Sequence, residues 1–312
     1  MLRSSIIGAA GFGGVEPAFL GDRGVTSGGW TADGPTFLDV IDYVSIPTTG
    51  NSTDFGDLTI GRSWAAGLAG GGRGVSLSGR INNTPTRTNV IDYITISTTG
   101  NATDFGDLLA ASEVGAGSSD GVRGLYAGGL DASAYRNEIQ YITIATTGNA
   151  TDFGDTVSVT ANLTGISSET RALFSGGVDT NSGFVNVIQY VTIATTGNAT
   201  DFGDLTVSRA WTGGFSDGSR GCWAGGGTDY IKNNVNTIDY VTIDTTGNAT
   251  DFGDILIAQR ELSGAANDTR GIISGGAASN VIQYVTIATT GNATDFGDLT
   301  VTRAESAGFS GD

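Results

Sequence analysis

The sequence contains no histidine, only one cysteine and only one lysine. Histidine is the commonest general base and the commonest metal ligand, so we predict no catalytic residue, no metal site and no cofactor. The single cysteine, Cys222, cannot form an intramolecular disulfide, which is typical of folding in a reducing cytosol. No run approaches 18 apolar residues, so we predict no membrane insertion.

Positive charge is also scarce, since the 312 residues carry a formal net charge of −17. An acidic surface repels phosphate backbones and anionic lipids, so we expect no nucleic-acid partner. Hydrophobic residues make up 38% of the chain, which is enough to support a core.

The clearest feature that is present is a repeat. The string TTGNATDF occurs five times, and TTGNSTDF adds a sixth copy. The glycine of TTGN therefore recurs at positions 50, 100, 148, 197, 247 and 291, with spacings of 50, 48, 49, 50 and 44 residues. Periods in this range are typical of β-propeller blades.

Each repeat reads as four short strands. One example runs from TGGFSD through RGCWAGG and TIDYVTI to the segment after TDFGD. The segments are 5 to 8 residues long, rich in β-branched residues, and separated by Gly, Asn, Asp and Ser. A single such sheet cannot bury both apolar faces, whereas a ring of six can. We predict an all-β, six-bladed propeller over residues 22–312, built from four-stranded antiparallel blades.

The two ends of the repeat region are complementary. Residues 22–60 begin with a second strand, and the chain ends after a first strand. We predict that residues of about 303–312 supply the inner strand of the first blade. The alternative is that Gly8–Gly14 occupies that place. Residues 1–21 lie outside the repeat and would be an N-terminal arm, either a plug or an anchor to a neighbouring subunit in a homo-oligomer.

The repeated TTGNATDF string is predicted to be the turn between the third and fourth strands. Gly and Asn would supply positive φ, and Phe would pin the turn between blades. Acidic pairs such as Asp104 and Asp107 recur in it. Two carboxylates fall short of the six to eight oxygens of a calcium site, so we favour caps and salt bridges over calcium.

One arginine recurs at the start of the second strand in every blade. Because the turns between strands one and two and between strands three and four share a face, these arginines should lie near the repeated aspartates. We predict a structural ring of Arg–carboxylate pairs that locks blade to blade. Its arginines are Arg23, Arg73, Arg123, Arg171, Arg220 and Arg270.

The segments that join strands two and three vary in length and content, and they lie on the opposite face. Aromatic and cationic residues on loops of a rigid scaffold are typical of contact surfaces, although drift on an unconstrained loop is an equal alternative. Trp64 and Trp211, at the starts of first strands, lie on that same face. The candidate binding residues are Trp30, Phe37, Arg80, Arg87, Tyr135, Arg136, Phe184, Tyr230 and Lys232.

The repeats resemble kelch repeats over residues 22–312. Shared features are the Gly-Gly that closes strand two, the tyrosine of strand three and a downstream aromatic before a strand that ends in Arg. Two departures are a Phe in place of Trp and the pair Ser78-Gly79 in the second blade. The string IDYVTIATTGNATDFGDLT also resembles repeats in structural and tail-fibre proteins of marine bacteriophages, which implies a virion component.

These features predict a non-enzymatic structural or adhesion module. On the resemblance, it would be a phage tail-fibre or decoration protein that contacts other virion proteins or a host surface receptor, and it would be located in the virion. One alternative is a lectin-like propeller that binds glycans through the variable loops, and another is a bacterial kelch-like interaction scaffold. Either alternative would allow an extracellular or cell-surface location.

Overall fold

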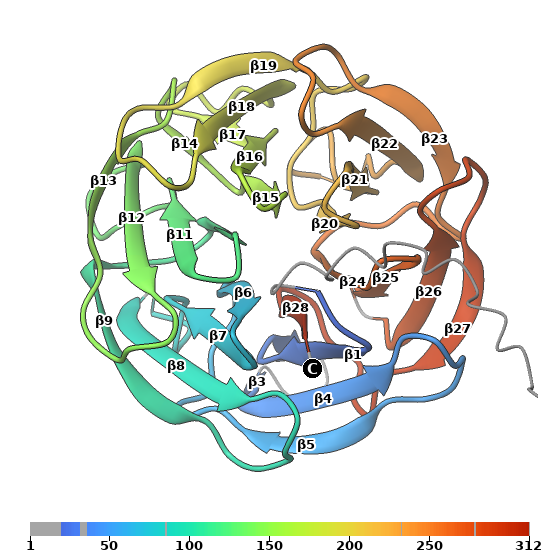
Figure 1. The fold of residues 1–312 in the computed structure, drawn as a ribbon, viewed down its shortest axis with the longest axis horizontal. Helices are drawn as coiled ribbons and strands as arrows, with labels where there is room; N and C mark the ends of the chain where they lie inside the picture. Colours follow the sequence, from blue (N-terminus) through green and yellow to red (C-terminus); the bar gives the residue numbers. More distant parts are fainter. Residues whose placement is uncertain (1–19, 32–35, 85, 232, 278, 312) are drawn as a thin grey trace, which may run out of the picture.

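The architecture is a closed ring of six antiparallel sheets (Figure 1). The structure is a computed structural model that describes residues 20–31, 36–84, 86–231, 233–277 and 279–311. Within these ranges every regular element is a β-strand, and none is a helix that could cross a membrane. The predicted six-bladed propeller is confirmed.

Each blade begins with its inner strand at the central channel and ends with its outermost strand. Blade 1 contains β28 (Ala307–Gly311), β1 (Arg23–Ser27), β4 (Val40–Ser45) and β5 (Thr53–Asp57). Blade 2 contains β6 (Ala66–Gly70), β7 (Arg73–Leu77), β8 (Thr88–Thr95) and β9 (Thr103–Ser112). Blade 3 contains β10 (Ala116–Ser119), β11 (Arg123–Ala127), β12 (Glu138–Thr143) and β13 (Thr151–Asp155).

The remaining blades repeat this order. Blade 4 contains β15 (Thr164–Ser167), β16 (Arg171–Ser175), β18 (Val187–Thr192) and β19 (Thr200–Asp204). Blade 5 contains β20 (Gly213–Ser216), β21 (Arg220–Ala224), β22 (Thr237–Thr242) and β23 (Thr250–Asp254). Blade 6 contains β24 (Leu262–Ala266), β25 (Arg270–Gly275), β26 (Val281–Thr286) and β27 (Thr294–Asp298).

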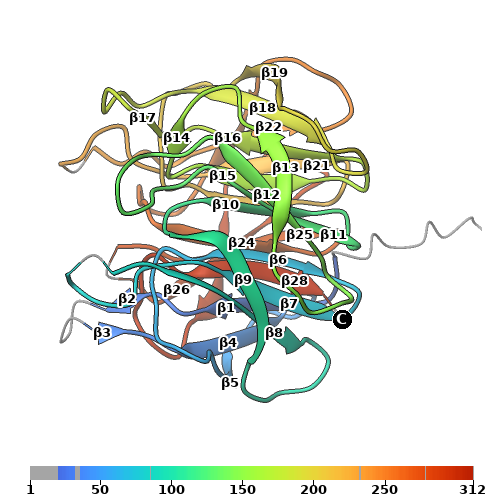
Figure 2. The ribbon, with the colours of Figure 1, turned by 90° about the vertical axis from the view of Figure 1, so that its left-hand side faces the viewer.

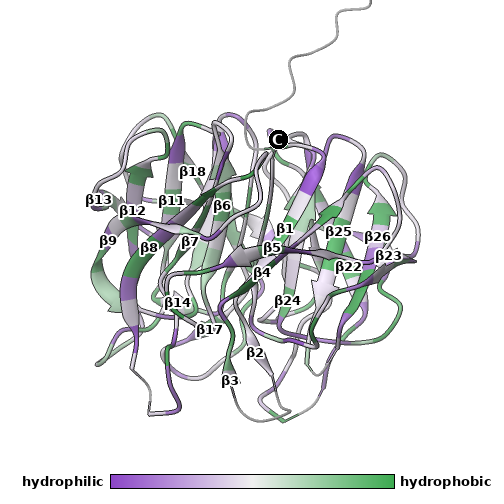
Figure 3. Ribbon diagram, turned by 90° about the horizontal axis from the view of Figure 1, so that it is seen from below, coloured by the Kyte–Doolittle hydropathy of each residue, from purple (hydrophilic) through white to green (hydrophobic). Residues whose placement is uncertain are grey.

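Two further pairs of short strands lie outside the blades. They are β2 (Trp30–Thr31) with β3 (Thr36–Phe37), and β14 (Thr160–Ala161) with β17 (Val178–Asp179). Figures 2 and 3 place these pairs at one side of the ring and the marked end of the chain at the other. We call the side with the loops between strands two and three the loop face, and the side with the TTGN turns the turn face.

The ring is closed by the last strand of the chain. Strand β28 pairs antiparallel with β1, so that Phe309 lies opposite Val25 and Ala307 opposite Ser27. This confirms that the C-terminal strand completes the first blade. The alternative segment, residues 8–14, lies outside the described residues, as does most of the predicted N-terminal arm.

The hydrophobic core is divided into six layers, one between each pair of neighbouring blades. The layer between blades 5 and 6, for example, joins Cys222, Ile238 and Phe252 to Leu262 and Ile273. The inner strands are buried on both faces because each face meets a neighbouring blade. A blade without its neighbours would expose both faces, which explains why the repeats close into a ring.

The repeated TTGN segment fastens each blade to the one before it. In blade 2, the N–H of Gly100 donates to the carbonyl of Phe55 at 2.8 Å, and the N–H of Ala102 donates to that of Asp57 at 2.7 Å. The N–H of Asp57 in turn donates to Asn101 Oδ1 at 3.1 Å. All six junctions have this outer clasp. The prediction that Asn supplies positive φ was wrong, because none of the TTGN asparagines has positive φ. Each contributes its side-chain oxygen to the clasp instead.

The glycine of TDFG is required where the clasp is tightest, and this gives a testable contrast. Gly253 has φ +147, and a Cβ there would lie closer than van der Waals contact to the carbonyl of Gly291. Gly291, on the other side of the same contact, would place a Cβ in open space. We expect Gly253→Ala to lower the free energy of unfolding by about 2–4 kcal/mol. Gly291→Ala should change it by less than about 0.5 kcal/mol. Urea denaturation of both variants measures the difference.

Buried polar groups differ between junctions in a matched way. Three junctions pair a buried arginine with an aspartate of the next blade: Arg62 with Asp92 at 2.6 Å, Arg209 with Asp239 at 3.0 Å, and Arg303 with Asp42. In each, a threonine hydroxyl also donates to the aspartate. The other three junctions have a glutamine in place of the aspartate. The Oε1 atom of each glutamine accepts a hydrogen bond from one backbone N–H, and these glutamines are Gln140, Gln189 and Gln283. Ser112, Thr160 and Gln259 replace the arginine there.

Candidate functional site

The six repeated arginines bridge blades, but not through carboxylates. Arg123 is typical, since its guanidinium lies 4.6 Å from the ring centroid of Tyr141 and donates to the carbonyl of Ile193 in the next blade at 2.8 Å. The equivalent contacts occur in all six blades. None of these arginines belongs to a salt bridge within the described ranges, so the predicted carboxylate partners were wrong.

The repeated arginines bind carbonyls because the turn directs its carboxylates and its backbone carbonyls to different sides. Asp104 and the equivalent aspartates of the other blades are exposed. The backbone carbonyls of the preceding isoleucines instead face the neighbouring blade, where the guanidinium reaches them. No group of three or more acidic or cysteine side chains in the described part of the chain is arranged to hold a metal ion. The turn face is therefore occupied by contacts that hold the ring together.

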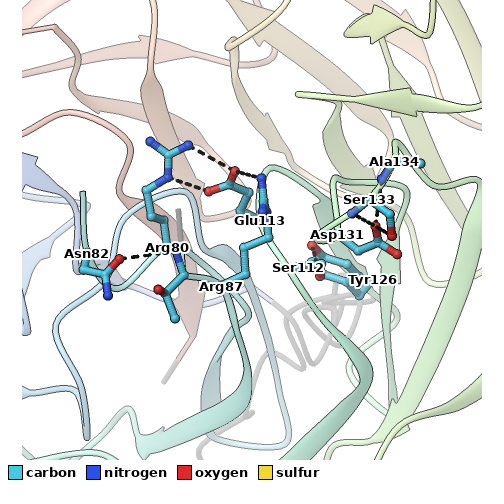
Figure 4. Close-up of polar contacts among 10 residues, drawn as sticks. Arg80, Asn82, Arg87, Ser112, Glu113, Tyr126, Asp131, Ser133 and Ala134 are labelled. Carbon is cyan, nitrogen blue, oxygen red and sulfur yellow. Dashed lines mark hydrogen bonds and ion pairs between the residues drawn. The ribbon is translucent and has the colours of Figure 1, made fainter. Parts of the chain in front are cut away.

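The predicted residues of the loop face fall into two groups, and the first is tied into the structure. Trp30 and Phe37 pair across β2 and β3. Arg80 and Arg87 each bind Glu113 at 2.8 Å, and that carboxylate is only 2% exposed (Figure 4). These two arginines neutralise a buried acid, so neither guanidinium could bind a ligand without breaking an ion pair.

The second group gathers aromatic rings from three successive blades. Phe184 lies 5.4 Å from Trp211 and 5.1 Å from Tyr230 between ring centroids, and the latter two lie 5.9 Å apart. Tyr230 is 49% exposed. Burial, with a further contribution from Tyr230, raises the pKa of Tyr135. The structure thus brings together the predicted residues Tyr135, Phe184 and Tyr230, and Trp211 joins them.

Two predicted residues remain outside both groups. Arg136 is 44% exposed and lies 3.5 Å from Asp131 and 3.8 Å from Glu138. Lys232 lies outside the described residues.

A second feature of the loop face surrounds the central channel. In each blade the residue shortly before the first strand adopts positive φ, between 57° and 65°, without being glycine. The N–H of each donates to the carbonyl of the equivalent residue in the preceding blade, at 2.7 to 3.5 Å, so the six bonds form a closed circle. We call these residues the mouth ring: Glu305, Trp64, Val114, Asn162, Trp211 and Glu261.

The mouth ring encloses a cavity of about 120 Å³. Its floor is a second ring, made of one glycine from the inner strand of each blade: Gly67, Gly117, Gly165, Gly214, Gly264 and Gly308. A Cβ at Gly67 would lie 2.6 Å from the carbonyl oxygen of Gly308, so only glycine lets the inner strands approach this closely. On the far side of the glycine ring is a cavity of about 80 Å³, which buried Leu20 lines.

The mouth ring places two glutamates side by side between two tryptophans. Glu261 has a partner, Arg260, at 3.2 Å. Glu305 belongs to no ion pair within the described ranges, and burial, with repulsion from Glu261 and Glu113, raises its pKa to about 8. Burial also raises the pKa of Glu261, and Arg260 opposes this rise. Two adjacent acids with raised pKa values at the mouth of a cavity are typical of a functional site.

The raised pKa of Glu305 predicts a pH dependence of stability. A carboxyl whose pKa is higher in the folded than in the unfolded state contributes stability at low pH and loses it as pH rises toward the folded pKa. We expect the free energy of unfolding to fall between about pH 5 and pH 8, and Glu305→Gln to flatten this slope. Thermal or urea unfolding at several pH values measures it. An unchanged slope in the variant would show that Glu305 ionises normally.

The sequence pattern predicts Trp64 and Trp211 on this face but gives no sign of Val114, Asn162, Glu261 and Glu305. An alignment of the six repeats with one another does not single out this position, because the residues on either side of it vary as well. Its backbone conformation could not be predicted, since positive φ at this point follows from the closure of the ring.

No model of a known protein family matches the chain, and no curated protein matches it. The observed blades therefore show a six-bladed β-propeller, a fold compatible with a non-enzymatic interaction module.

Proposed function

We propose that this chain is a non-enzymatic binding module whose loop face contacts a partner. The observation that carries the proposal is the difference between the two faces. The turn face is nearly identical in six blades and is occupied by clasps and arginine bridges. The loop face holds the variable segments, the aromatic cluster and the mouth ring. Aromatic residues on such a face are typical of binding surfaces.

The module is best placed on a bacteriophage particle, as a tail-fibre or decoration protein that contacts other virion proteins or a host surface receptor. This part of the proposal rests on the resemblance of the repeats to phage structural proteins. A rigid acidic ring with one variable face suits an adhesion role, because the scaffold can stay constant while the contact surface changes. Mass spectrometry of purified particles tests it, and absence of the chain from them would overturn the virion assignment.

Glycan binding is the second candidate. Phe184, Trp211 and Tyr230 form a contiguous aromatic surface, and the exposed ring of Tyr230 is suited to stacking on a sugar. A glycan array probed with the full chain tests this candidate. Tyr230→Ala should lower binding at least tenfold, whereas Val122→Ala, at an exposed position of the turn face, should leave it unchanged. Binding that both variants retain would place the contact elsewhere.

A further inference from the structure

The backbone of the mouth ring indicates that its side chains matter. Positive φ favours glycine, and other residues adopt it only at an energetic cost. The chain uses glycine at most positions with positive φ, yet none of the six mouth-ring positions has one. β-branched Val114 is the least suited to this conformation, at φ 57. Six unfavourable residues around one opening are explained if the side chains they carry serve the cavity below.

The side chains on one half of the ring define the chemistry of the opening. Around the circle, Trp64 neighbours Glu305, Glu305 neighbours Glu261, and Glu261 neighbours Trp211. A carboxylate supplies charge-assisted hydrogen-bond acceptors, and an indole face attracts cations. Arg260 already pairs with Glu261 and lies 5.1 Å from the ring centroid of Trp211. The acid left to bind a ligand is therefore Glu305, with Trp64 as its neighbouring indole.

We propose that the mouth ring binds an organic cation that carries a primary ammonium or guanidinium group. This deepens the proposed binding function and depends on it for biological meaning, but the site itself can be tested separately. The cavity of about 120 Å³ is smaller than the several hundred Å³ of typical ligand pockets, so it fits a side-chain-sized group better than a whole sugar.

The charges around Glu305 favour a cation over a neutral ligand. The charged groups that act on it are Glu261 and Glu113, which repel its negative charge, and Arg80, which attracts it; a hydrogen bond with Ser63 also favours the ionised form. Glu113 is itself paired with Arg80 and Arg87, and Glu261 with Arg260, so Glu305 is the acid of this group that belongs to no ion pair among the described residues. A bound cation would stabilise the ionised carboxylate, whereas a neutral ligand would leave the cost of burying it.

Binding should release a proton, because free Glu305 has a pKa of about 8. We therefore expect affinity for a cation to rise with pH by a factor approaching 10 per unit between about pH 6 and 7, and to level off above about pH 8.

The test is calorimetric titration of the full chain with n-butylammonium and n-butylguanidinium, with neutral n-butanol as the matched probe. We expect dissociation constants of roughly 1 mM for the cations and no detectable binding of butanol. Glu305→Gln should weaken cation binding at least tenfold and remove its pH dependence. Glu169→Gln, at an exposed position of the turn face, is the control and should leave both unchanged.

A lysine-containing peptide distinguishes the two sources of such a group. Tighter binding of the peptide than of butylammonium indicates a protein partner, and equal binding indicates a free amine. The proposal is overturned if the cations do not bind, if butanol binds equally well, or if Glu305→Gln binds like the unaltered chain. Cation binding by a full chain that binds neither glycans nor particles would overturn the proposed function alone, whereas partner binding without cation binding would overturn the mouth-ring site alone.

Discussion

Deleting residues 306–312 is expected to abolish the cooperative native fold. The deletion removes β28, which pairs with β1 over five residues and completes the ring of glycines around the channel. It also removes Phe309, which is 5% exposed and packs in the layer between blades 1 and 2. Both faces of blade 1 then lose their inner edge, and the ring has no closing strand. Loss of a cooperative thermal transition, followed by circular dichroism, measures this.

The matched control restores the same strand from the other end. Moving residues 306–312 to precede Asp22, in place of residues 1–21, gives β28 a direct turn into β1, as in the other five blades. We expect this permuted chain to regain a cooperative transition. A truncated chain that melts like the full one would show that the closing strand contributes little.

Arg209→Gln is expected to lower the free energy of unfolding by about 3–5 kcal/mol, because breaking a buried ion pair leaves an uncompensated charge. Both Arg209 and Asp239 are fully buried. Burial lowers the pKa of Arg209, and Asp239 opposes this shift. Thr206 still donates to the aspartate in the variant, but a single hydroxyl does not replace a guanidinium. Urea denaturation gives the loss, with Arg136→Gln, at a 44% exposed side chain, as a control expected to change it by less than about 1 kcal/mol.

The chain itself suggests how to rescue this variant. The junction between blades 5 and 6 has Leu256, Gln259 and Gln283 where the junction between blades 4 and 5 has Thr206, Arg209 and Asp239. We expect the triple variant Thr206→Leu, Arg209→Gln, Asp239→Gln to recover more than half of the lost stability, because its glutamine needs only the backbone N–H. Equal instability of the single and triple variants would show that the loss comes from altered packing and not from the unpaired aspartate.

The fold could be predicted from the sequence because its determinants are local and repeated. A period near 50 residues and four short strands per repeat specify a blade, and the incomplete ends specify the closing strand. The partners of the repeated arginines could not be predicted, because a guanidinium can bind either a carbonyl or a carboxylate. For Arg123, only the orientation of the neighbouring turn determines that the acceptor is the carbonyl of Ile193. Likewise, asparagine is a common turn residue, so the sequence predicts a turn. That the asparagine side chain binds a backbone N–H of the preceding blade depends on how close that blade lies.

The candidate site was predictable only in part, for a similar reason. Variable aromatic loops mark the loop face, and Phe184 and Tyr230 do meet there. Which loops meet depends on their lengths and on the spacing of blades around the ring. Arg80 and Arg87 are no longer candidate binding residues, because both pair with Glu113. These pairs could not be predicted, since Glu113 lies far from either arginine in the sequence.

Residue-resolved hydrogen–deuterium exchange of the full chain tests the closed ring most directly. In a closed ring the amides of β28 should exchange as slowly as those of the equivalent inner strands β6 and β10, through global unfolding. Exchange should also be slow at Gly50, whose N–H donates to the carbonyl of Phe296 across the junction of blades 6 and 1. Fast exchange in β28 and at Gly50, with β6 and β10 protected, would mean an open arc of blades and would contradict the account.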